Sequence, residues 1–223
     1  INTIGYKSQQ VSFKSLLYQN LQSTSTNNAG ENKPVAAEVG LGSRVAAITS
    51  TFTQGNLTHV ENPFSVALEG DGFFQIRTES GELQYTRDGS FEISPVANGN
   101  MLCTSDGNPV LDAYGNQIIL PSNRVATDLV VNQDGTLAFP DGTGNPAVIT
   151  DANGRPVKFG IYQFNNPAGL SKEGSNNYSV TVASGAAVAE NGNAAVKQTK
   201  THQYYTEASN VDVANEMVNL IVA

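Results

Sequence analysis

The sequence predicts a mainly β protein: an antiparallel β-sandwich or barrel-like domain with short helical segments at both termini. The 223 residues include 21 glycines and 9 prolines, and only 14% of them are charged, which suits many short strands joined by turns. The 39% apolar content is enough for a core. Tight turns are marked by Asp-Gly pairs at Asp71, Asp88, Asp106, Asp134 and Asp141 and by Asn-Gly pairs at Asn98 and Asn153.

The stretch 67–76 and a second, similar stretch, 85–91, form the predicted centre of the domain. Gly70 and Gly72 flank Asp71, and bulky β-forming residues follow at once, which indicates a turn feeding a buried strand. In the second stretch, two aromatic residues flank a Thr-Arg-Asp-Gly turn, which indicates a hairpin. We expect the aromatic residues of both stretches to enter the core: Phe73, Phe74, Tyr85 and Phe91.

An N-terminal helical segment is predicted over residues 1–22. Apolar residues recur there at helical spacing, namely Phe13, Leu16, Leu17 and Leu21, and Ser8 is a candidate N-cap. The resulting stripe packs either on the chain's own domain or on another subunit. From the residues alone the first is favoured, since most amphipathic helices pack within their own chain.

An extended polar arm and a linker strand are expected over residues 23–62. The arm, Ser23–Glu38, has too little apolar area to order itself, so we expect it to be mobile in the isolated chain. A strand is predicted over 39–53, and Asn62-Pro63 breaks the chain before the β domain, 63–203.

The start of a further helix is predicted over residues 204–223. Ser209 or Asn210 is the candidate cap, and Asp212 lies in the first turn, where the helix dipole favours an anion. One face carries Ala214, Met217, Val218 and Ile221. Because the chain starts at Ile1 without a methionine and stops at Ala223 within this apolar pattern, we expect it to be a fragment cut at both ends.

The charge and composition disfavour several classes of partner. With 20 acidic and 12 basic residues the net charge is −8, which would repel nucleic acid and anionic lipid. No apolar run is long enough to insert in a membrane. The single cysteine, Cys103, is expected to be a small buried hydrophobe.

Reactive groups are scarce, so no catalytic, cofactor or metal site is expected. His59 and His202 lack partners at metal-ligand spacing. Glu69 and Asp71 form a carboxylate pair, which in a turn is weak evidence for glycoside chemistry. A hydrolase function is disfavoured, because the sequence offers no pair of a nucleophile and a base. The alternative is a secreted β-rich adhesin or carbohydrate-binding module with calcium at loops 105–108 and 132–135, although neither loop completes a calcium-binding pattern.

Several segments together resemble the bacterial flagellar basal-body rod and hook protein family, in the family's order and over nearly the whole chain. They are Asn2–Lys7, Phe13–Leu17, Gln54–Leu57, Gly70–Ile76, Tyr85–Phe91 and Glu207–Val213. Their signature residues are Gly70, Asp71, Gly72, Phe73, Phe74, Tyr85, Arg87, Asp88, Gly89, Phe91, Ser209, Asn210 and Val211. The polar stretch between Tyr18 and Val45 resembles the insertion of distal rod subunits, with proximal rod subunits as the alternative.

The resemblance implies a structural role without catalysis or cofactor. Subunits of this family polymerise helically into the drive shaft that carries motor torque to the hook, after export through the flagellar type III system to the extracytoplasmic basal body. The implied partners are copies of the same chain, neighbouring rod and hook proteins, and ring or bushing proteins. The resemblance also reassigns both apolar stripes, at Phe13, Leu16, Leu17 and Leu21 and at Ala214, Met217, Val218 and Ile221, to assembly interfaces.

Overall fold

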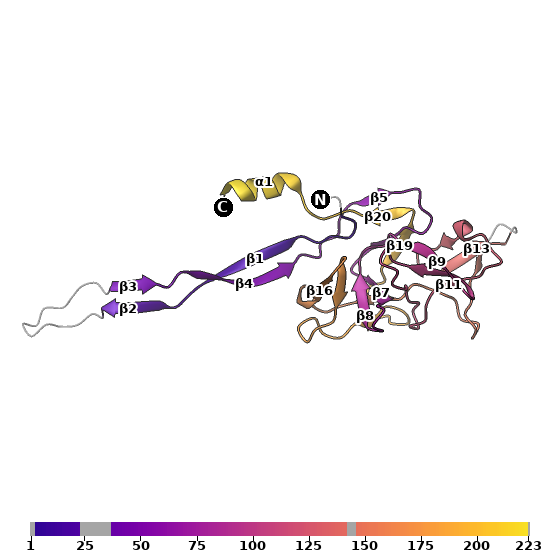
Figure 1. Ribbon diagram of the computed structural model, residues 1–223, viewed down its shortest axis with the longest axis horizontal. Coiled ribbons are helices and arrows are strands. Elements are labelled where there is room, and N and C mark those ends of the chain that lie inside the picture. Colours follow the sequence, from indigo (N-terminus) through magenta and orange to yellow (C-terminus); the bar gives the residue numbers. More distant parts are fainter. Residues whose placement is uncertain (1–2, 23–36, 142–145, 223) are drawn as a thin grey trace, which may run out of the picture. The chain divides into compact units, whose positions relative to one another are not determined.

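The computed structural model describes residues 3–22, 37–141 and 146–222 (Figure 1). The chain divides into two compact units. The first, called the β domain, combines Ile1–Ser8 with Phe52–Ala223, and the second, called the hairpin unit, is Gln9–Thr51. Of the polar arm expected to be mobile, residues 23–36 lie outside the described residues.

The hairpin unit consists of strands, which corrects the helix predicted over residues 1–22. Its elements are β1 (Gln9–Ser15), β2 (Tyr18–Gln22), β3 (Ala37–Gly40) and β4 (Ser43–Ser50). β1 pairs with β4 and β2 with β3, both antiparallel. Ser8 caps no helix, because β1 begins at the next residue; the Ser8 backbone N–H donates to Asn210 Oδ1. The segment fits a helical spacing, but Val11 and Phe13 also fit the two-residue period of a strand. Pairing with β4 stabilises the strand.

The β domain holds the remaining strands, and every strand pairing in the described chain is antiparallel. Its largest sheet has six strands in the order β16-β17-β8-β7-β15-β18. These strands are β7 (Phe73–Arg77), β8 (Leu83–Thr86), β15 (Ile161–Gln163), β16 (Ser171–Gly174), β17 (Asn177–Ser179) and β18 (Val188–Ala189). The sequence expectation of a mainly β, antiparallel fold is confirmed, as several small sheets rather than a closed barrel.

Four smaller sheets complete the β domain. Two have three strands, in the orders β11-β10-β9 and β12-β13-β14, and two are the pairs β19-β6 and β20-β5. Their strands are β5 (Leu57–His59), β6 (Val66–Glu69), β9 (Glu92–Val96), β10 (Gly99–Cys103), β11 (Ile119–Leu120), β12 (Val130–Val131), β13 (Leu137–Pro140), β14 (Pro146–Val148), β19 (Lys200–Gln203) and β20 (Tyr205–Glu207). Two 3₁₀ turns, η1 (Ala126–Asp128) and η2 (Pro167–Gly169), lie between strands.

The aromatic residues of the central stretches are buried in two clusters. Phe74 and Phe91 belong to the larger one and meet edge to face, with ring centres 4.9 Å apart. Phe73 and Tyr85 belong to the smaller one. All four side chains are buried, as the sequence indicated, and so is Cys103. Phe73 and Phe74, adjacent in β7, thus point to opposite faces of the sheet and enter different clusters.

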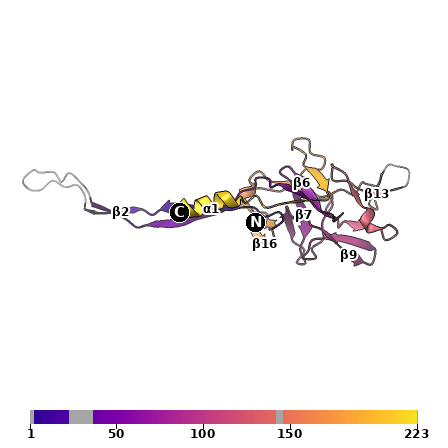
Figure 2. The same cartoon turned by 90° about the horizontal axis from the view of Figure 1, so that it is seen from above.

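The C-terminal segment forms the expected helix, α1 (Val213–Val222), which follows β20 through a short extended segment (Figures 1 and 2). Its cap differs from both candidates. Asp212 Oδ1 accepts the Ala214 N–H at 3.0 Å, and the Asp212 carbonyl oxygen accepts the Glu216 N–H at 3.0 Å, so Asp212 is the N-cap. No helix within the described ranges is long and apolar enough to cross a membrane.

Candidate functional site

A buried ion cluster joins the two ends of the β domain. Lys7 Nζ lies 2.6 Å from Glu207 Oε1, and Arg87 Nε lies 3.1 Å from Glu207 Oε2. The side chains of Lys7 and Glu207 are 0% exposed and that of Arg87 is 3% exposed. The three residues come from the N-terminal segment, from the turn after β8 and from the end of β20. We call them the junction.

Arg87 also shapes the glycine-rich turn between β6 and β7. Its Nη1 donates to the carbonyl oxygens of Gly70 and Gly72, both at 2.6 Å. Gly70 has φ +136°, a conformation that favours glycine, and a Cβ on Gly72 would lie 2.5 Å from Ile161 Cγ2. The two signature motifs are therefore one structural unit, in which the arginine of the second motif binds the glycine turn of the first.

Backbone groups close the shell around the junction. Glu207 Oε1 accepts the Gly55 N–H at 2.8 Å, and Lys7 Nζ donates to the Thr53 carbonyl oxygen at 2.8 Å. Asn210 accepts the Ser8 N–H through Oδ1 at 2.8 Å and donates to Thr53 Oγ1 through Nδ2 at 2.9 Å. The signature residue Asn210 therefore ties chain segments together instead of capping α1.

The junction buries two cations against one carboxylate, and this imbalance shapes its pKa values. Burial lowers the pKa of Lys7 from its ordinary value, the nearby Arg87 charge lowers it further, and Glu207 only partly opposes them. Burial alone would raise the pKa of Glu207, but the charges of Arg87 and Lys7 and the hydrogen bonds from Lys7 and Gly55 outweigh it and lower the pKa. The carboxylate is therefore held ionised.

The predicted C-terminal interface residues lie on α1 and are exposed. Met217 is 61% exposed, Ile221 is 84% exposed, and Ala214 and Val218 are exposed as well. Leu220, which the sequence reasoning omitted, is also exposed. α1 thus presents an apolar surface that stays exposed among the described residues.

A second apolar surface lies on the hairpin unit, where a bulge gathers it on one face. Val11 lies opposite Ile48, and Phe13 lies opposite Val45. Because Ser12 pairs with Ala47, Ala46 is the extra residue of β4, and it returns Val45 to the face of Ile48. The four large side chains, Val11, Phe13, Val45 and Ile48, are all exposed.

The other predicted N-terminal interface residues do not share that surface. Leu17 is exposed and Leu16 is half-buried, and both follow β1. Leu21 lies in β2, and its side chain is not among those described. Of the predicted stripe residues whose side chains are described, only Phe13 therefore belongs to the apolar face of the β1–β4 pair. Its partners Val11, Val45 and Ile48 were missed because they align only in the strand register.

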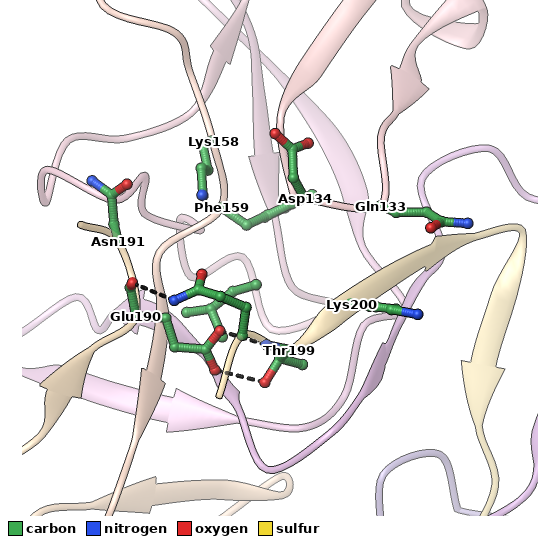
Figure 3. Close-up of a pocket in the computed structure, with 10 residues that line it drawn as sticks. Gln133, Asp134, Lys158, Phe159, Glu190, Asn191, Thr199 and Lys200 are labelled. Carbon is green, nitrogen blue, oxygen red and sulfur yellow. Dashed lines mark hydrogen bonds between the residues drawn. The ribbon is translucent and has the colours of Figure 1, made fainter. Parts of the chain in front are cut away.

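A hollow of about 310 Å³ lies outside the junction and includes Glu190, Lys158 and Thr199 in its lining (Figure 3). Glu190 Oε1 accepts from Thr199 Oγ1 at 2.6 Å and from Gln163 Nε2 at 2.7 Å, and its Oε2 accepts the Thr199 N–H at 2.7 Å. Figure 3 shows Glu190 turned toward Thr199, while Lys200 extends away from it. Glu190 therefore fixes the loop before β19, and its oxygens are occupied by structural hydrogen bonds.

Histidines and acidic turns have local partners. His202 Nε2 lies 2.7 Å from Glu69 Oε2, and His59 stacks on Tyr204. Asp134 in loop 132–135 accepts hydrogen bonds from the N–H and hydroxyl of Thr136, as a turn residue does. No group of three His, Cys, Asp or Glu side chains suited to a metal occurs in the described part of the chain. These contacts favour the turn interpretation over calcium binding.

Sequence reasoning singled out Arg87 and Asn210 but not Lys7 or Glu207 as site residues. Both missed residues belong to segments that resemble the flagellar family. That resemblance was the one feature of the sequence that could have marked them as site residues. Their pairing, however, links positions 200 residues apart and has no local signature.

Comparison with known proteins agrees with these features. The family model described as the flagellar hook protein FlgE/F/G D1 domain matches residues 67–139. The model described as the flagellar basal body rod FlgEFG protein C-terminal matches residues 202–223. The two matches include the glycine turn, Arg87 and Glu207, so they cover the principal parts of the junction outside the N-terminal segment.

Whole-chain relatives point the same way. The flagellar basal-body rod protein FlgG of Agrobacterium fabrum is 35% identical over 100% of this chain and 80% of its own length. The proteins of the same name from Borreliella burgdorferi and Buchnera aphidicola (Acyrthosiphon pisum) are 34% and 33% identical, over 100% and 99% of this chain and 79% of each relative. The chain therefore belongs to the flagellar basal-body rod and hook protein family, in its distal-rod branch.

Proposed function

We propose that this protein is a structural, non-catalytic subunit of the bacterial flagellar rod. In this proposal it polymerises helically with copies of itself and transmits motor torque to the hook. Its further partners are neighbouring rod and hook proteins and ring or bushing proteins. Its place is the extracytoplasmic basal body, after type III export. The observation that carries the proposal is the exposed apolar face of α1, which is attached through β20 to the junction.

The apolar faces supply a driving force for polymerisation. Fully burying an aliphatic side chain such as Ile221 or Leu220 is favourable by about 1.5–3 kcal/mol. Both are more than 80% exposed in the single chain, so contact with another subunit offers them most of that gain. The four-residue face of the hairpin unit offers a further surface, and an isolated two-stranded pair is marginally stable until something packs on it.

The junction suits a subunit that carries load. Torque passing between subunits pulls on the segments that leave the β domain, and Lys7 and Glu207 fasten two of these segments to each other in the interior. Hydrogen bonds between charged groups are about twice as strong as those between neutral groups. The junction therefore resists separation of the segments at the point where they enter the domain.

The test compares polymerisation of three variants of this rod protein. Met217→Asp and Phe13→Asp place a charge on the α1 face and on the hairpin face, and Val125→Asp places one at an exposed site outside both faces. We expect the first two variants to stay unassembled in sedimentation and negative-stain microscopy, with unchanged circular dichroism. Val125→Asp should form straight filaments. Filaments of normal yield from both Met217→Asp and Phe13→Asp would refute the assignment of these faces.

A further inference from the structure

Residues 3–8, which we call the clasp, are attached to the β domain chiefly by polar contacts. The Gly5 N–H donates to the Glu207 carbonyl oxygen at 2.8 Å, and Asn176 Nδ2 donates to the Ile4 carbonyl oxygen at 2.8 Å. Neither buried apolar cluster includes a clasp residue. Segments with few buried apolar contacts open at lower free energy than the core does.

The charges of the junction balance when the clasp is open. Arg87 Nε and the Gly55 N–H then still bind Glu207, so the remaining buried pair is neutral and hydrogen-bonded. Closure brings in Lys7 as a second cation, and burial beside Arg87 lowers the pKa of Lys7. Opening the clasp returns that cation to water and leaves no isolated buried charge behind, which removes the main electrostatic penalty for opening.

The closed clasp also reaches the connection between β20 and α1. The Ser8 N–H donates to Asn210 Oδ1, and Asn210 Nδ2 donates to Thr53, which in turn accepts from Lys7. Asn210 lies two residues before the N-cap Asp212. The clasp therefore contacts Glu207 at the end of β20 and Asn210 in the connection, on either side of Ala208.

We propose that the clasp opens and closes on the β domain as a unit, and that its closure through Lys7 orders the connection 208–212 and the first turn of α1. The coupling acts within a single chain. It is independent of the proposed rod function, so either can fail without the other.

Amide hydrogen exchange of the soluble chain, followed by mass spectrometry, tests the coupling. Lys7→Met removes the hydrogen bonds from Lys7 Nζ to Glu207 and to the Thr53 carbonyl oxygen, which hold the clasp closed. Lys158→Met is a matched change at a lysine outside the junction. We expect Lys7→Met to speed exchange about tenfold in both 3–8 and 208–216, because a local opening equilibrium sets these rates. Exchange in β7 should stay at the wild-type rate, and Lys158→Met should leave all three regions unchanged.

The reciprocal variant approaches the coupling from the other side. Since coupling between two sites is reciprocal, Asn210→Ala should speed exchange in the clasp as well as in 208–216. Faster exchange confined to the mutated side in either variant would overturn the coupling. A Lys7→Met protein that exchanges faster equally in β7, or that fails to fold, would show that the clasp is part of the core and would overturn the proposal too.

Discussion

Lys7 and Glu207 lie 200 residues apart in the sequence, yet Lys7 Nζ and Glu207 Oε1 are 2.6 Å apart and fully buried. Arg87 completes the group and binds the glycine turn between β6 and β7. The junction thus connects both ends of the β domain to its central hairpin. Replacing each of its three members leaves a different set of buried charges. The variants should therefore differ in how much unfolding free energy they lose.

Glu207→Gln should be the most damaging junction variant, since it leaves Lys7 and Arg87 buried together without a counter-charge. Breaking a buried ion pair by removing one partner costs about 3–5 kcal/mol. Lys7→Met leaves the neutral Arg87–Glu207 pair and should cost less than half as much. Free energies of unfolding from urea titrations test the order, with Arg155→Met at a partly exposed pair as a control expected to lose less than about 1 kcal/mol. Equal losses for Glu207→Gln and Lys7→Met would contradict this charge accounting.

Acid should weaken the β domain through the same carboxylate. The pKa of Glu207 in the folded chain is lowered below its ordinary value of 4.5, so its contribution to stability is fully present above pH 4.5. That contribution is lost as the pH falls from 4.5 through the lowered pKa, because the unfolded chain then binds the proton more readily. The difference in unfolding free energy between wild type and Glu207→Gln, measured from pH 7 to pH 3, should therefore shrink. A difference that is constant over this range would mean that Glu207 does not titrate as the structure indicates.

Local sequence signals predicted the central part of the fold. The Asp-Gly turns, the strands beside them and the burial of Phe73, Phe74, Tyr85 and Phe91 depend on neighbours within a few residues. The mainly β class follows from the same signals. The helix at the C-terminus was also visible, since its apolar spacing and its early acidic residue lie within one short segment.

Features that depend on distant partners were not predictable in this way. Phe13 and Leu17 fit a helical spacing, but β1 is fixed by its pairing with β4, more than twenty residues further along. Asn210 is a good helix cap by type, but Ser8 and Thr53 engage its side chain, and Asp212 takes the cap. In both cases tertiary contacts overrode a valid local preference.

Gly89 should be intolerant of any side chain for a steric reason. A Cβ at this position would lie 1.7 Å from the Val66 carbonyl oxygen. This is a steric clash that only a movement of β6 could relieve. Gly81 has φ +86° and open space around it, so Gly81→Ala meets only backbone strain of about 1 kcal/mol. We expect Gly89→Ala to lower the melting temperature far more than Gly81→Ala does. Similar melting temperatures for the two variants would show that β6 can yield at Val66.

Calcium should leave the stability of the chain unchanged. A ligand that binds only the folded state raises the melting temperature as its concentration exceeds its Kd, so a calcium-dependent module would gain several degrees in millimolar calcium. In this chain Asp134 is engaged by the N–H and the hydroxyl of Thr136, and Asp151 by Arg155, so these carboxylates already have partners. Differential scanning calorimetry with about 5 mM calcium, which exceeds the roughly 0.1–1 mM Kd of extracellular modules, should match a scan with chelator. A calcium-dependent rise that Asp134→Asn abolishes would restore the calcium-binding interpretation of loop 132–135.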